Sequence, residues 1–158
     1  MGTVRQFELF HGAVLTALLR RDHPIALSMV ETMPSDSWST YRINDEVNLV
    51  VTHSTTGTKQ RRSNEVAWQF TFSPAQITQI REGHAYVALV CGSPSVKAEM
   101  EVCLLDPSQI EKLIDIQSPQ QQAVSVRASS SLKVYSGRHV KEITVAKNKY
   151  RKWEVPGS

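Results

Sequence analysis

Two short segments carry the same strand-to-helix junction, and they limit the folds that the chain can adopt. One lies at residues 72–77 (Phe-Ser-Pro-Ala-Gln-Ile) and the other at residues 105–110 (Leu-Asp-Pro-Ser-Gln-Ile). In each, Ser or Asp suits the N-cap, proline suits the first helical position, and the glutamine suits a capping box. An apolar run precedes each junction. The chain therefore alternates strands with helices, and an α/β (α+β) fold is expected.

Periodic apolar residues predict the other elements. The spacing of Phe7, Phe10, Val14 and Leu18 indicates an amphipathic helix over residues 4–20. Period-two alternation or short apolar runs indicate strands, and each junction begins a helix. The strands are predicted at residues 25–31, 42–53, 66–72, 85–91, 98–105, 123–128, 132–136 and 142–146, and the two further helices at 74–82 and about 107–115.

The length of 158 residues is that of one ordinary domain. We expect a single domain over residues 1–158, with a mixed central sheet flanked by helices. Its core spans about residues 4–116, and a C-terminal β extension with a basic tail spans about 123–158. Hydrophobic residues make up 41% of the chain and charged residues 21%, which excludes a wholly disordered or fibrous protein. No apolar run approaches the ~18–20 residues that span a bilayer, so no membrane association is expected.

The N-terminus and the cysteines indicate a cytoplasmic protein. Glu8 and His11 interrupt the apolar residues that a signal peptide would need. Cys91 and Cys103 both lie in apolar runs, where a reduced thiol packs like a small hydrophobic side chain. A disulfide between them would close a short loop and is the alternative, although secreted scaffolds usually carry more cysteines.

Positive charge is concentrated near the C-terminus. The whole chain has a formal net charge of +3, whereas residues 133–152 contain seven Lys or Arg and one Glu, a net charge of +6 that leaves −3 for the remainder. Tyr150 and Trp153 accompany these cations. Lys and Arg neutralise phosphates and aromatic rings stack on exposed bases, so this segment suits nucleic acid. A second cationic segment lies at residues 59–62. Solvated charged surfaces are the alternative interpretation.

The common catalytic signatures are absent from the sequence. It has no glycine-rich phosphate loop, no nucleophile elbow, no Cys-x-x-Cys pair and no His-Glu-x-x-His motif. The five histidines are scattered singly, and each is interpreted as a surface or packed residue. No cation adjoins either cysteine, so neither thiol is predicted to be a nucleophile.

Carboxylates near the ends of predicted elements supply the candidate metal ligands. Glu8 lies on the first predicted helix, Glu31 follows the first predicted strand, and Asp45 and Glu46 open the second. Acidic side chains at neighbouring strand ends can hold Mg²⁺, which prefers oxygen ligands. Glu8 and Asp45 are therefore the predicted metal ligands, with Mg²⁺ as the cofactor that they would take. Solvated strand termini are the alternative.

The predicted element order αβββαβ over residues 4–92 resembles the core of the restriction-endonuclease-like, or PD-(D/E)xK, superfamily. The resemblance is one of element order. It implies a nucleic-acid ligand, with Asp45 as the acid of the second strand and Glu8 as the acid of the first helix in a metal site. A fold shared with nucleases does not by itself establish their activity.

The third predicted strand departs from the pattern of that superfamily. Gln69-Phe70-Thr71 stands where the resemblance requires Glu-x-Lys. Gln69 can offer an oxygen to a metal, but Thr71 does not replace the charge of the lysine. Catalysis is therefore expected to be lost. Migration of a basic residue such as Lys59 into the vacant position is the alternative.

The leading functional hypothesis is a nucleic-acid-binding domain that is catalytically degenerate. Its predicted nucleic-acid contacts are Lys59, Arg61, Arg62, Lys147, Lys149, Tyr150, Arg151 and Lys152. The first alternative is an active Mg²⁺-dependent nuclease that uses Glu8, Asp45 and Gln69.

The second alternative is an interaction module without nucleic acid. In it, exposed strand edges and Trp38, Trp68 or Trp153 would mediate self-association, for example as a homodimer. Trp153 and Val155 have a further structural interpretation, in which they fold back and cover a sheet edge.

Overall fold

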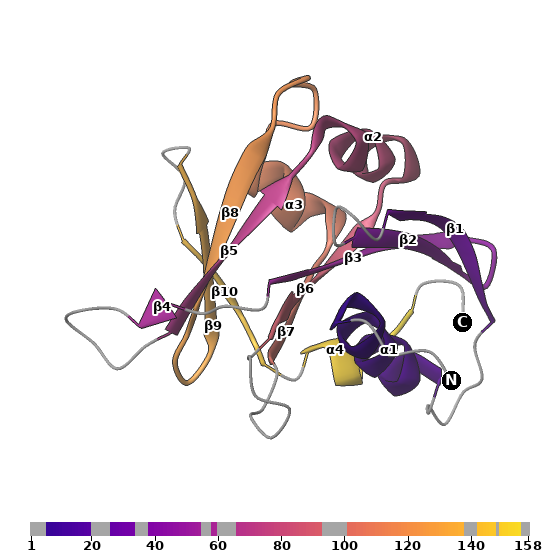
Figure 1. Ribbon diagram of the computed structural model, residues 1–158, viewed down its shortest axis with the longest axis horizontal. Helices are drawn as coiled ribbons and strands as arrows, with labels where there is room; N and C mark the ends of the chain where they lie inside the picture. Colours follow the sequence, from indigo (N-terminus) through magenta and orange to yellow (C-terminus); the bar gives the residue numbers. More distant parts are fainter. Residues whose placement is uncertain are drawn as a thin grey trace.

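The computed structural model describes residues 6–19, 26–33, 38–54, 58–59, 66–92, 101–137, 142–147 and 149–155 (Figure 1). Its helices are α1 (Gln6–Leu19), α2 (Pro74–Gly83), α3 (Pro107–Leu113) and α4 (Lys149–Lys152). Its strands are β1 (Leu27–Met33), β2 (Trp38–Ile43), β3 (Val47–Ser54), β4 (Thr58–Lys59), β5 (Val66–Phe72), β6 (Tyr86–Cys91), β7 (Glu101–Leu105), β8 (Gln122–Ala128), β9 (Leu132–Ser136) and β10 (Ile143–Val145). The three predicted helices are confirmed, and the structure adds the short helix α4.

Both strand-to-helix junctions have the predicted N-caps. Ser73 Oγ accepts a hydrogen bond from the backbone N–H of Gln76 at 3.3 Å. At the second junction, Asp106 Oδ1 accepts from the N–H of Gln109 at 2.8 Å, and Gln109 Oε1 accepts from the N–H of Asp106 at 3.1 Å. The reciprocal pair is a complete capping box, which satisfies two helix-terminal donors at once.

The strands form two five-stranded sheets. The first sheet has the order β1-β2-β3-β6-β7, in which β3 and β6 are parallel and the other pairs are antiparallel. The second sheet has the order β10-β9-β8-β5-β4 and is antiparallel throughout. The α+β class and the mixed sheet are confirmed. The strand predicted at residues 66–72, however, lies in the second sheet, because β5 pairs along its whole length with β8.

The single strand predicted at residues 42–53 is a hairpin. β2 and β3 pair antiparallel with Ile43 opposite Val47, and a tight turn joins them. Asn44 and Asp45 in that turn have φ angles of 54° and 59°. Asn and Asp tolerate this left-handed conformation better than other residues with a side chain, so the reversal occurs here within the apolar pattern.

The main hydrophobic core lies between the two sheets. Trp38 and Val50 of the first sheet pack in one cluster with Phe70 and Val126 of the second. The buried faces of α2 and α3 join the same cluster through Ile77 and other apolar residues. The inner face of each sheet is therefore removed from water.

The outer face of the first sheet is covered by α1 and by the C-terminal segment (Figure 1). Val14 and Leu18 of α1 pack there in a second hydrophobic cluster. Trp153 and Val155 belong to the same cluster and are buried. The predicted folding back is confirmed, but the prediction of a covered sheet edge is wrong, because Trp153 packs on Tyr86 of the interior strand β6.

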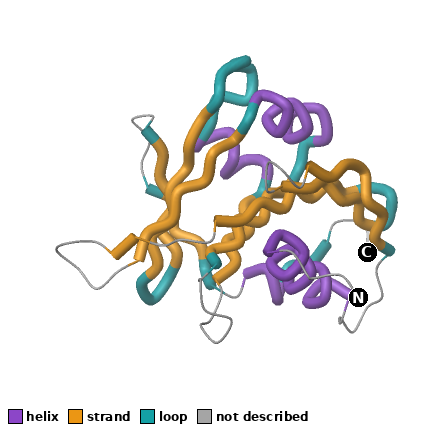
Figure 2. Tube along the Cα trace, in the orientation of Figure 1, coloured by secondary structure: helices purple, strands orange, loops and turns teal. Residues whose placement is uncertain are grey.

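Among the described elements, no helix lies on the outer face of the second sheet (Figure 2). Along β5, Trp68, Phe70 and Phe72 are buried, whereas Gln69 and Thr71 between them are exposed. Figure 2 shows the helices on the opposite side of this sheet, toward the first sheet. The second sheet thus presents one polar face to solvent. Among the described helices, none is long and apolar enough to cross a membrane.

Candidate nucleic-acid interface

The open face of the second sheet is built from two rows of polar side chains that cross the strands. One row runs Gln69–Ser125–Tyr135, because Gln69 lies opposite Ser125 and Ser125 lies opposite Tyr135. The other row runs Arg127–Lys133–Thr144 in the same way. Strand alternation directs all six side chains away from the core. We call these six residues the open-face rows.

Two cations lie side by side in the second row. Arg127 and Lys133 are directly opposite one another on β8 and β9, where like charges destabilise a sheet. Arg127 Nη2 forms an ion pair with Glu142 Oε2 at 3.0 Å, and Lys133 Nζ donates to Thr144 Oγ1 at 2.9 Å. The side chains of Arg127 and Glu142 are about one third exposed, so their ion pair is partly screened by water. Arg127 and Lys133 are thus held by their contacts with Glu142 and Thr144 and remain accessible to solvent.

An aromatic ring adjoins the cations. Tyr135 is half-buried on the open face, and the guanidinium carbon of Arg127 lies 5.9 Å from the centroid of its ring. That distance is within the range of a cation–π interaction. A phenol ring, a planar guanidinium and a lysine ammonium therefore share one face of the second sheet.

The predicted contacts at residues 147–152 have mainly structural partners. Lys147 Nζ lies 3.5 Å from Glu101 Oε1. Lys149 Nζ donates to Gln109 Oε1 at 2.9 Å and lies 3.9 Å from Asp106 Oδ2. These contacts attach the C-terminal segment to β7 and to the start of α3.

The remaining residues of this segment are divided between core and solvent. Tyr150 is half-buried against the cluster under α1, and the guanidinium carbon of Arg151 lies 5.1 Å from the centroid of the Tyr150 ring. Arg151 and Lys152 are exposed. They therefore form a smaller cationic surface, separate from the open-face rows.

Of the predicted contacts at residues 59–62, the structure describes only the backbone of Lys59. Lys59 lies on β4, the edge strand next to β5, with its backbone opposite Val66. Arg61 and Arg62 lie outside the described residues. Only the backbone position of Lys59 therefore relates this segment to the second sheet.

Two of the predicted metal-site residues, Asp45 and Gln69, lie among the described residues, and the structure does not bring them together. Asp45 is exposed in the turn between β2 and β3 of the first sheet. Gln69 points outward from the second sheet, with the core between the two sheets behind it. Glu8 lies in α1, and its side chain is outside the described set. No group of three or more His, Cys, Asp or Glu side chains that could hold a metal occurs among the described residues. Asp45 is therefore separated from Gln69, because its turn belongs to the first sheet and β5 belongs to the second, whereas the pairing of Glu8 with Asp45 stays a prediction.

The cysteines are free, buried thiols, as the sequence predicts. Cys91 and Cys103 are both fully buried between the sheets. Burial raises the pKa of Cys103 to about 12 and raises the pKa of Cys91 well above its usual value. At neutral pH both sulfurs are protonated, so they are poor nucleophiles.

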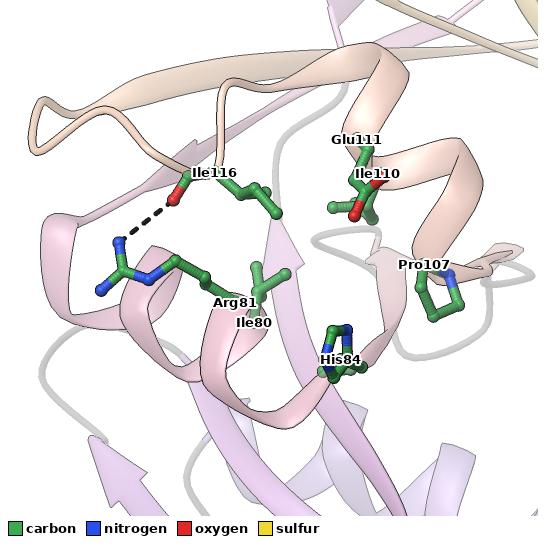
Figure 3. A pocket seen from close by; sticks show the side chains of 8 residues that line it. Ile80, Arg81, His84, Pro107, Ile110, Glu111 and Ile116 are labelled. Carbon is green, nitrogen blue, oxygen red and sulfur yellow. Dashed lines mark hydrogen bonds between the residues drawn. The ribbon is translucent and has the colours of Figure 1, made fainter.

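A small pocket lies between α2 and α3 (Figure 3). Arg81 Nη1 closes one side by donating to the carbonyl oxygen of Ile116 at 3.2 Å. His84 and Glu111 supply further polar groups. The pocket holds only about 10 Å³, room for roughly one water molecule. This pocket therefore does not fit an organic substrate.

The open-face rows contain residues that sequence reasoning missed. Arg127 and Tyr135 lie in strands that were predicted, and the period-two pattern of those strands is the signal that places them on a polar face. The pattern does not show that β8 pairs with both β5 and β9.

No protein-family model, curated protein or solved structure matches the chain.

Proposed function

We propose that the protein binds single-stranded nucleic acid on the open face of the second sheet and does not cleave it. The observation that carries the proposal is a sheet face that no described helix covers, on which Tyr135 adjoins the cations Arg127 and Lys133. The αβββαβ order that suggested the same class of ligand is not the order of the structure, because β2 and β3 are separate strands and β4 precedes β5, so the proposal depends on the open face. Two buried, free thiols suit a reducing compartment, so we place the protein in the cytoplasm.

The chemistry of the face fits a single strand. Lys133 can neutralise one phosphate, and Arg127 can neutralise a second when that phosphate replaces Glu142 as its partner. The ring of Tyr135 can stack on a base, which is accessible when the base is unpaired. Gln69 and Ser125, in the row of Tyr135, carry amide and hydroxyl groups that can form hydrogen bonds with base edges.

The separation of Asp45 from Gln69 supports binding without cleavage. The turn of Asp45 belongs to the first sheet and Gln69 points outward from the second, which does not favour a shared cation. Incubation of the protein with labelled single strands and duplexes in Mg²⁺ or Mn²⁺ tests this part. We expect full-length nucleic acid throughout, and metal-dependent products that disappear in Asp45→Ala would contradict the proposal.

The binding itself is tested by fluorescence anisotropy with labelled single-stranded DNA and RNA over a range of salt concentrations. The double variant Arg127→Gln/Lys133→Gln should weaken binding and reduce the salt slope by roughly 0.7 for each phosphate that the variant no longer neutralises. The matched control is Arg151→Gln/Lys152→Gln, which removes the same charge from the α4 surface. Thermal unfolding of both variants verifies that each is folded.

The outcomes are distinct. Loss of affinity in the first variant and wild-type affinity in the control supports the proposal. An equal loss of affinity in both double variants indicates a general effect of charge and contradicts the assigned surface. A loss of affinity in the Arg151→Gln/Lys152→Gln control alone contradicts it as well. Absence of any binding by the wild-type protein at low salt rejects the function. Tyr135→Phe should retain affinity, while Tyr135→Ser should lose about 1–3 kcal/mol of binding free energy if the ring stacks on a base.

A further inference from the structure

Two histidines that are far apart in the sequence lie together under α1. His11 Nε2 of α1 is 3.2 Å from His53 Nδ1 of β3. Their ring centroids are 5.3 Å apart, and the ring planes make an angle of 77°. His11 is buried and His53 is half-buried, so the pair lies at the boundary between the core and the surface.

Apolar packing on both sides sets the separation of the pair. His11 shares a helix face with Val14 and Leu18, which pack against the outer face of the first sheet. His53 shares a strand face with Leu49 and Val51, which belong to the same cluster. The two rings are therefore brought together by the docking of α1 on β3, which also limits how far they can separate.

The geometry is suited to a metal ion as well as to a hydrogen bond. Two nitrogens bound at ~2.0–2.1 Å to one tetrahedral ion lie roughly 3.3 Å apart, close to the separation of these nitrogens. Neutral imidazole is a good ligand for Zn²⁺ and other late first-row metals. Mg²⁺, by contrast, prefers oxygen ligands.

We propose that His11 Nε2 and His53 Nδ1 bind one transition-metal ion of the Zn²⁺ class, with water completing the coordination. The ion replaces the hydrogen bond between the rings. The ring that donates in that bond transfers its proton to its other nitrogen, so both imidazoles remain neutral. The half-exposed ring of His53 gives the ion access from solvent. The site is independent of the nucleic-acid surface, because it lies on the first sheet.

The test uses the full chain and Zn²⁺ alone. Isothermal titration calorimetry should give one ion per chain, and the Tm should rise with Zn²⁺ concentration because the ion binds the folded state. His53→Gln and His11→Gln should both lose the binding and the Tm shift. If His11→Gln does not fold because residue 11 is buried, His53→Gln alone tests the zinc site, since residue 53 is only half-buried.

The matched control is His84→Asn. His84 is an exposed histidine at the end of α2 with φ of 46°, a conformation that Asn tolerates. This variant should bind Zn²⁺ like the wild type. No Zn²⁺ effect on the wild-type protein, or an unchanged effect in His53→Gln, overturns the proposal.

Co²⁺ gives an independent readout. Its visible absorption should match nitrogen and oxygen ligands and should disappear in His53→Gln. A thiolate-to-cobalt charge-transfer band would instead place the ion on Cys91 or Cys103 and would overturn the assignment.

Discussion

The indole ring of Trp153 lies against the phenol ring of Tyr86, with the centroids 4.7 Å apart and the planes at 39°. Tyr86 begins β6, in the interior of the first sheet, so this contact attaches the C-terminal segment to the sheet. Val155 is buried beside it in the same cluster. The segment that is richest in positive charge is therefore also part of the hydrophobic cover of the first sheet.

Trp153→Ala should destabilise the fold. Trp153 is only 8% exposed, and truncation of a buried aromatic ring costs about 3–5 kcal/mol of unfolding free energy. Urea denaturation followed by circular dichroism measures this loss. The control is the adjacent exposed residue, and Lys152→Ala should change the unfolding free energy by less than about 0.5 kcal/mol. Similar small effects of both substitutions would show that the packing of Trp153 on the first sheet does not contribute to stability.

Gly83→Ala should destabilise the contact of α2 with β3. A Cβ at residue 83 would lie 2.6 Å from Asn48 Nδ2, and the same nitrogen donates to the carbonyl oxygen of Gly83 at 3.1 Å. The Asn48 side chain must move, so we expect a loss of about 1–3 kcal/mol in urea denaturation. In the double variant with Asn48→Ala the loss should be smaller than the sum of the two single losses.

Gly12 in α1 offers the matched control for this substitution. A Cβ there meets nothing within 4 Å among the described atoms. Gly12→Ala should stabilise the protein by roughly 0.5–1 kcal/mol, because alanine loses less backbone entropy in a helix. Destabilisation by Gly12→Ala and tolerance of Gly83→Ala would contradict the described packing.

Asp45→Gly should stabilise the hairpin of β2 and β3. Asp45 has φ of 59°, and glycine adopts this conformation without the cost of roughly 1 kcal/mol that a Cβ carries. Asn-Gly is favoured in hairpin turns whose two central residues both have positive φ, as residues 44 and 45 do. Asn44→Gly should not give the same gain, because Asn44 Oδ1 accepts a hydrogen bond from the N–H of Ala26 at 2.8 Å. Thermal unfolding of the two variants compares them directly, and a lower Tm for Asp45→Gly would indicate that its carboxylate has a structural role.

Stability should fall at alkaline pH because of the buried thiols. Below a pH of about 8.5, both the folded and the unfolded states hold neutral thiols, so their ionisation has no effect. As the pH rises further, the unfolded state releases a proton that folded Cys103, with its pKa raised to about 12, retains. The unfolding free energy therefore decreases toward pH 12, by up to ~1.4 kcal/mol per pH unit for one thiol.

Other groups also ionise in this range, so the contribution of the thiol is isolated by comparison. Burial also raises the pKa of Tyr41, for example. Urea midpoints of the wild type and of Cys103→Ala at pH 8 and at pH 10 provide the measurement. The wild type should lose more stability than the variant between the two pH values. Equal losses would show that Cys103 ionises as readily in the folded protein as in the unfolded one.

Local signals in the sequence were sufficient for much of the secondary structure. The residues at 106–109 form the expected capping box because every bond in it joins groups within three residues. The alternation along β5 correctly separates buried Trp68 from exposed Gln69. The hairpin turn was missed because Asn44 and Asp45 interrupt the apolar pattern only briefly.

Pairing between distant segments could not be derived in the same way. β5 has the composition of a strand, but its partner β8 is separated from it by two helices and two strands. Several antiparallel or parallel partners satisfy the same period-two pattern. The sequence predicted one central sheet, whereas the strands form two. Asp45 and Gln69 therefore do not share a surface.

The sequence by itself determined α1, α2 and α3, the N-caps of α2 and α3, the apolar faces and the local excess of positive charge, because these depend on neighbours within a few residues. Tertiary structure alone decided that Arg127, Lys133 and Tyr135 share an open face, and that His11 meets His53. Those relationships depend on strand pairing and on the docking of α1, which bury apolar surface between segments that are distant in the chain. The candidate sites of this protein arise from those long-range contacts.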